Sequence, residues 1–108
     1  MACETAVVAS AVGGIPEVVV PNETGLLVDP GLLPGTFEPA DPAAFSVNLA
    51  DAINRLARDP ALRARFGKAG RERAVAHFSW DAIAHATAAL YRSVVEHRAK
   101  DQAIPPGP

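Results

Sequence analysis

The 108-residue sequence has a single cysteine, no long apolar run and no excess of basic residues. One cysteine, Cys3, excludes an intrachain disulfide and suits a reducing compartment, so we expect a cytoplasmic protein with a small buried thiol. Without about 18 consecutive apolar residues, no membrane span is expected. The sequence has ten Lys and Arg and twelve Asp and Glu, which gives a net charge of −2. That balance argues against nucleic acid as a partner.

The sequence also lacks the side-chain spacings of a metal or nucleophile site. His77, His85 and His97 do not form the i, i+4 pair that a helix offers to a metal. Cys3 has no base beside it in the sequence. We therefore predict no catalytic residue, no metal and no cofactor in this chain, and interpret the three histidines as ordinary helix-surface or boundary residues.

A strand, a glycine turn, a short helix and a second strand are predicted over residues 5–28. The run Ala6–Ala9 is small and β-branched, as in a strand of a parallel sheet. Gly13 and Gly14 follow where the chain would turn into a helix. That helix would begin near Pro16, because a proline in the first helical turn removes no hydrogen bond. Residues 26–28 then form the second strand.

Three helices are predicted to follow. Each begins at a residue that can cap its first turn: Asp41 before Pro42, Asp59 before Pro60, and Ser79. Apolar residues recur at helical spacing after each cap, namely Phe45, Leu49, Ala52, Ile53 and Leu56; then Leu62, Phe66 and Ala69; then Trp80, Ile83, Ala84, Thr87, Leu90, Tyr91, Val94 and Val95. We expect these stripes to be packing surfaces.

Some residues of these helices allow two interpretations. Gly67 and Gly70 either weaken the second helix or let another backbone approach it closely. The basic residues between Arg63 and Arg73 are interpreted as a solvated face. Glu17 could touch a ligand, but stabilisation of the short helix at its positive end is the simpler reading.

The predicted fold class is α/β, with two parallel strands plus helices. Two short strands do not make a stable sheet, and a doubly wound domain needs more of them. We therefore expect residues 1–98 to be part of a larger domain, and residues 99–108 to be a disordered tail.

Two stretches carry a family resemblance. MACETAVVASAVGGIPEVVVPNETGLLVDP and FGKAGRERAVAHFSWDAIAHATAALYRSV resemble the C-terminal end of family 4 glycosyltransferases of the GT-B fold. The segment ACETAVVAS is most similar to the corresponding segment of actinobacterial glycogen synthases, including the maltose-1-phosphate-forming kind. Glu4 and Ala6 depart from the general pattern, where many members have glycine and proline.

The resemblance implies the C-terminal part of a GT-B Rossmann-like, nucleotide-sugar-binding domain. The implied reaction is retaining transfer of glucose from a nucleotide sugar, ADP-glucose, to an α-glucan or glucose 1-phosphate in glycogen synthesis. Gly13 and Gly14 would lie close to the donor. The family's paired glutamates and phosphate-binding basic residues would lie before Met1, as if a start codon had been assigned at an internal methionine or the reading frame were split. The chain alone would then be inactive.

Two alternatives stay open. Gly13 and Gly14 also suit a simple tight turn, because glycine serves turns generally. The chain could equally be a non-catalytic interaction module that docks on a partner through its apolar helix faces.

Overall fold

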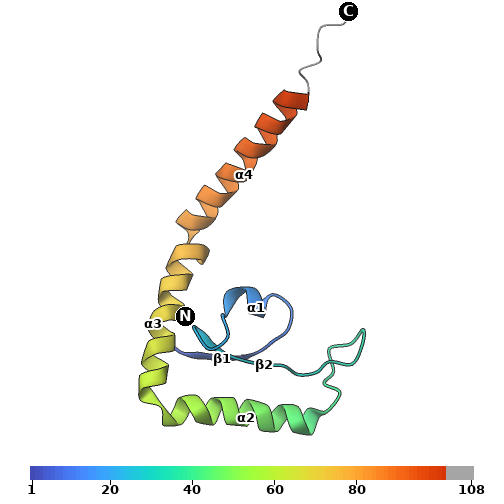
Figure 1. The fold of residues 1–108 in the computed structure, drawn as a ribbon, viewed down its shortest axis with the longest axis vertical. Coiled ribbons are helices and arrows are strands. Elements are labelled where there is room, and N and C mark those ends of the chain that lie inside the picture. Colours follow the sequence, from blue (N-terminus) through green and yellow to red (C-terminus); the bar gives the residue numbers. More distant parts are fainter. Residues whose placement is uncertain (102–108) are drawn as a thin grey trace, which may run out of the picture. The chain divides into compact units, whose positions relative to one another are not determined.

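A computed structural model describes residues 1–101, with side chains to residue 98. Its elements are β1 (Val7–Ser10), α1 (Ile15–Val18), β2 (Gly25–Val28), α2 (Pro42–Arg58), α3 (Pro60–Phe78) and α4 (Trp80–Asp101) (Figure 1). The chain divides into two compact units, residues 1–74 and the residues from Val75 onward, and each is described by itself.

The two strands pair in parallel, as the sequence predicts. Their register runs from Val7 opposite Gly25 to Ser10 opposite Val28. Helix α2 packs against both strands, and α1 lies on the other side of them (Figure 1). The first unit is therefore a small α/β layer, with strand boundaries that differ by one residue from the predicted ones.

The loop into β2 is closed by a buried threonine and a glycine. The Thr24 hydroxyl accepts a hydrogen bond from the Val20 N–H at 2.9 Å and is fully enclosed. At Gly25 an added Cβ would lie 2.6 Å from the Val7 carbonyl oxygen and 2.9 Å from Val19 Cγ1. Any side chain at position 25 would thus separate the strands, so glycine is required there.

A small hydrophobic core joins the sheet to α2 and α3. Its buried members are Leu26, Leu56, Leu62 and Phe66, and Ala6, Val8 and Ala52 pack against them. Phe66 is 0% exposed and is the largest enclosed side chain of the described residues. Full burial of such a side chain contributes about 1.5–3 kcal/mol, so this cluster is the main source of cohesion in the first unit.

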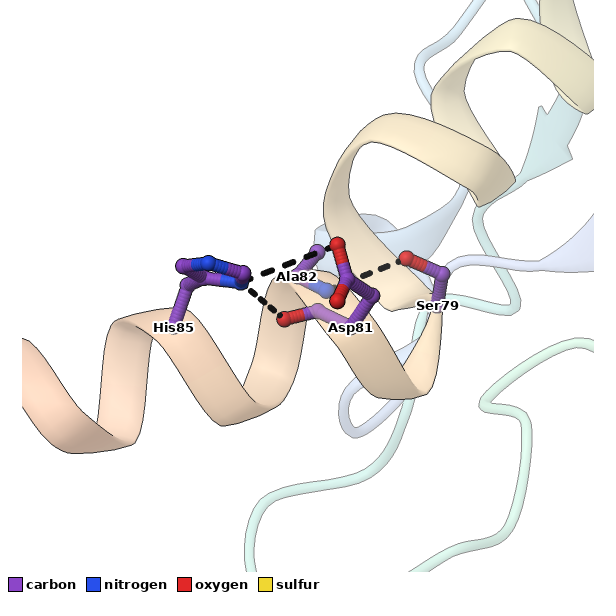
Figure 2. Close-up of polar contacts among 4 residues, drawn as sticks. All are labelled: Ser79, Asp81, Ala82 and His85. Atoms are coloured by element: carbon purple, nitrogen blue, oxygen red, sulfur yellow. Dashed lines mark hydrogen bonds and ion pairs between the residues drawn. The ribbon is translucent and has the colours of Figure 1, made fainter.

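The three predicted caps are confirmed. Asp41 accepts from the Ala44 N–H at 2.9 Å, and Asp59 accepts from the Leu62 N–H at 2.8 Å. Figure 2 shows the third, in which the Ser79 hydroxyl accepts from the N–H of Ala82 at 3.2 Å. Each cap satisfies a backbone donor that the first helical turn leaves without a partner.

Helix α3 lies directly against the segment that leads into β1. A Cβ added at Gly67 would be 2.0 Å from the Glu4 carbonyl oxygen, whereas one at Gly70 would meet Met1 side-chain carbon atoms at 3.5 Å. Both glycines are buried. Of the two interpretations of these glycines, the close backbone approach is therefore correct for Gly67.

Helix α4 confirms the predicted helix, and its apolar stripe is exposed in this chain. Trp80 is 87% exposed and Leu90 60%, and Tyr91 and Val95 are exposed as well. The helix also includes residues 99–101, which the sequence placed in the tail, and the remainder of that tail, 102–108, lies outside the described residues. No helix in the described part of the chain is long and apolar enough to cross a membrane.

The contrast between the two glycines of α3 gives a testable expectation. Gly67→Ala should destabilise the fold by about 1–3 kcal/mol, because its methyl group collides with backbone that cannot rotate away. Gly70→Ala is the matched control. It should stabilise by up to about 1 kcal/mol, the difference in helix propensity between the two residues. Urea unfolding of a protein that carries the complete domain measures both, and equal effects would contradict the assigned contact.

The exposed apolar face of α4 gives a second expectation. The 108-residue chain by itself should self-associate and bind a hydrophobic dye, because a large exposed apolar patch is an association site. Sedimentation velocity and dye fluorescence measure this, with the double variant Leu90→Lys, Val94→Lys as the control that lowers both signals. A monomer with a sharp melt and no dye binding would show the expectation to be wrong.

Candidate functional site

The glycine turn stands at the carboxyl end of β1. The Ala11 N–H donates to the Val28 carbonyl at 2.8 Å, which extends the strand pairing by one bond. The chain then reverses at Gly13, whose φ of +53° lies in the left-handed region that favours glycine. Gly14, with φ −83° and ψ 0°, is the residue before the first turn of α1.

The space above this turn is open. A Cβ added at Gly13 or at Gly14 would meet no atom within 4 Å, and both residues are exposed. The backbone conformation explains glycine at position 13. At position 14 the residue is the N-cap of α1, where glycine is favoured over residues such as alanine and valine.

The other predicted residues of α1 take the expected places. Pro16 is in the first turn, and Glu17 is the acidic residue of that turn. A carboxylate there interacts favourably with the positive end of the helix. The simpler reading of Glu17 therefore accounts for its position.

The histidines lie on helices close to neighbouring backbone. Figure 2 shows His85 beside Asp81: its Nδ1 is 2.8 Å from the Asp81 carbonyl oxygen and 3.6 Å from the carboxylate Oδ2. In the same way, His97 Nδ1 is 3.0 Å from the Ser93 carbonyl oxygen. In residues 1–98 no three His, Cys, Asp or Glu side chains are grouped so that they could hold a metal ion.

Cys3 corrects one expectation. The structure places it on the surface, where the sequence predicted a small buried thiol. In the segment before β1, the Ala2 carbonyl accepts a hydrogen bond from Arg71, and the Glu4 carbonyl lies close to Gly67. The side chain of Cys3 is therefore free to face outward.

The arginines of α3 lie on an exposed face, as the sequence predicts, with Arg73 half-buried. Three of them also donate to main-chain carbonyls, which the sequence did not predict. Arg63 donates to Leu56 and Ala57, at 2.6 and 2.7 Å, and so caps the end of α2. Arg71 donates to Ala2, and its Nε lies 3.8 Å from Glu4 Oε1.

The third, Arg73, reaches α1. Its Nε donates to the Val18 carbonyl at 2.9 Å, and its Nη2 donates to the Glu17 carbonyl at 2.7 Å. These bonds join residues more than fifty positions apart. A helix-surface arginine has the same local sequence pattern whether or not it makes such contacts, so no sequence signal indicates them.

The sequence did not predict the cleft between β2 and α2. Its volume is about 450 Å³, and it is lined by Asn22, Leu26, Leu27, Val28, Asp29, Asn48, Asp51, Ala52 and Arg55. Arg55 donates across it to the Asn22 side-chain oxygen at 3.4 Å. Its polar lining residues come from α2 and from the chain on either side of β2, so the periodicity of α2 alone does not reveal the cleft.

Comparisons with known proteins place the chain in a family. The family model described as "Glycosyl transferases group 1" matches residues 1–73. "Alpha-maltose-1-phosphate synthase" of Mycolicibacterium smegmatis is 49% identical over 94 residues, which are 87% of this chain and 22% of that protein. "D-inositol 3-phosphate glycosyltransferase" of Kribbella flavida is 38% identical over 100 residues, 93% of this chain and 20% of that protein.

A solved structure agrees in fold. "Sucrose-phosphate synthase" from Thermosynechococcus elongatus superposes with a TM-score of 0.66 and 45% identity, over 89% of this chain and 21% of that one. The match is to the C-terminal part of a GT-B glycosyltransferase. The chain thus spans about a fifth of the length of the relatives it matches. It belongs to the group 1 glycosyl transferases, the family 4 enzymes of the GT-B fold that its sequence resembles.

Proposed function

We propose that this chain supplies part of the donor-binding side of a retaining glucosyltransferase that uses ADP-glucose. The acceptor would be glucose 1-phosphate or an α-glucan, in glycogen synthesis. The observation that carries the proposal is the 49% identity with an α-maltose-1-phosphate synthase, against 38% with an inositol-phosphate glycosyltransferase. A nucleotide-sugar donor and an acceptor are the partners, and the cytoplasmic location rests on the single cysteine.

The geometry of the glycine turn supports a donor-side role for Gly13 and Gly14. Doubly wound sheets bind ligands outside the carboxyl ends of their strands. The turn follows the carboxyl end of β1, and the space at both glycines is open. A sugar or diphosphate could therefore approach the backbone here more closely than any side chain would permit.

The proposed chemistry breaks the bond between the sugar's anomeric carbon and the diphosphate oxygen and forms a bond to an acceptor hydroxyl, which loses its proton. Such reactions depend on positioning and on groups that stabilise the departing diphosphate. Among residues 1–98 the buried polar side chain is Thr24, which already bonds within its own loop. As the family resemblance implies, the charge-stabilising groups would come from outside this chain.

A second candidate is a non-catalytic interaction module. The exposed apolar residues of α4, such as Leu90 and Tyr91, favour it, because an apolar patch of this kind marks a docking surface. The two proposals differ in what happens when the chain is joined to the rest of a relative: the first gives an active enzyme and the second does not.

The direct test is a hybrid in which this chain replaces the matched segment of the Mycolicibacterium smegmatis relative. We expect the hybrid to transfer labelled glucose from ADP-glucose to glucose 1-phosphate, and the 108-residue chain alone to give no turnover. UDP-glucose and glycogen serve as the comparison donor and acceptor. A hybrid that melts cooperatively but transfers nothing would contradict the proposed function, and turnover by the chain alone would show that it holds the stabilising groups itself.

A graded series at position 14 tests the donor-side turn. Gly14→Val in the hybrid should raise the KM for ADP-glucose roughly tenfold, equivalent to about 1.4 kcal/mol of lost binding, because the side chain would occupy the space proposed for the donor. Gly14→Ala should have a smaller effect in the same direction. Both variants should stay folded, since an added Cβ meets nothing within 4 Å and the loss of a favourable N-cap residue costs about 1 kcal/mol. An unchanged KM in both variants would make the turn purely structural.

A further inference from the structure

Helix α1 is too short to be stable without tertiary contacts. It has four residues, and an isolated helix of this length is unstable in water. Two internal bonds close it, from Glu17 N–H to the Gly14 carbonyl at 3.1 Å and from Val19 N–H to the Ile15 carbonyl at 2.9 Å. The carbonyls of Glu17 and Val18 belong to its last turn, where helical partners are lacking.

Arg73 supplies the partners for both of these carbonyls. One guanidinium donates to two successive carbonyl oxygens at 2.9 and 2.7 Å, a two-point contact that fixes orientation as well as distance. Its planar group carries a positive charge to the negative end of the helix dipole. Arg73 is half-buried as a residue, and both of these hydrogen bonds lie at the exposed surface of the first unit.

The part of α3 that precedes Arg73 is packed against the core. Seven residues before Arg73 on the same helix, Phe66 is fully enclosed in the core, and Gly67 meets the Glu4 carbonyl. Helix α3 is thereby fixed to the segment that enters β1. Arg73 then fixes the helix that leaves the glycine turn, so α3 holds the turn from both sides.

We propose that Arg73 is a positioning residue for the nucleotide-sugar donor: by binding the end of α1, it holds the Gly13–Gly14 turn in the conformation that receives the donor's phosphates or sugar. This inference rests on the proposed function. The positioning acts through α1, since the guanidinium is engaged with the Glu17 and Val18 carbonyls.

The experiment uses the hybrid with three substitutions. Arg73→Met removes the donors but keeps an unbranched apolar stem, and Arg73→Lys keeps the charge without the two-point geometry. Arg71→Met is the matched control, because Arg71 also donates to a main-chain carbonyl from α3, but at Ala2 rather than at α1.

We expect Arg73→Met to raise the KM for ADP-glucose about three- to tenfold, the range for the loss of one ordinary hydrogen bond, with kcat within about twofold. Arg73→Lys should recover part of the loss, and the KM for glucose 1-phosphate should not change. Arg71→Met should leave the donor KM within about twofold. Hydrogen exchange of peptides covering residues 11–20 should become faster in Arg73→Met and not in Arg71→Met.

Each outcome bears on the proposal. Unchanged exchange over residues 11–20 in Arg73→Met would overturn the claim that Arg73 holds the turn. Faster exchange with an unchanged donor KM, or an equal rise in both variants, would overturn its link to the donor. A folded but inactive parent hybrid would instead contradict the proposed function, and the exchange comparison tells the two failures apart because it needs no turnover.

Discussion

The close contact between α3 and the segment before β1 is the constraint on which the first unit depends. Phe66 fills the core, and at Gly67 the helix backbone reaches the Glu4 carbonyl with no room for a methyl group. If this contact opens, the sheet loses the helix that ties its first strand to the core. Two parallel strands have little stability of their own, so their pairing relies on the helices around them.

The same contact sets the position of the glycine turn. Helix α3 meets the chain just before β1 through Gly67 and just after the turn through Arg73. Helix α3 therefore contacts the chain both before and after β1. Strand β1 is also paired with β2, which approaches it closely at Gly25. If the turn receives the donor as proposed, these supports organise it before the ligand arrives, which lowers the ordering cost of binding.

Most of the local structure could be predicted from the sequence, because its signals are local. Asp41, Asp59 and Ser79 each precede the helix they cap. The run at Val7 and Val8 is apolar and β-branched as in a parallel sheet, although all four residues of β1 are only partly buried in this chain, where the sequence predicted a buried strand. The long-range contacts could not be predicted. The Arg73 contact depends on the relative placement of α3 and α1, which no spacing within either element encodes.

Exposure was also hard to predict, for a different physical reason. The spacing of Trp80, Leu90 and Val94 shows that α4 has an apolar face, but not what covers it, and in this chain these residues are exposed. The cleft between β2 and α2 could not be predicted either, because it depends on how close Asn22, in the loop before β2, lies to α2 residues such as Asp51. Periodicity identifies a face, whereas burial depends on the partner.

The glycines of the first unit have different structural explanations. Gly25 and Gly67 are required by close contacts, and Gly13 by its positive φ. Gly14 is the N-cap of α1, where glycine is favoured over residues such as alanine and valine. The local structure therefore accounts for both glycines of the turn. The donor-side role proposed for them depends instead on the place of the turn at the carboxyl end of β1, the end at which doubly wound sheets bind ligands.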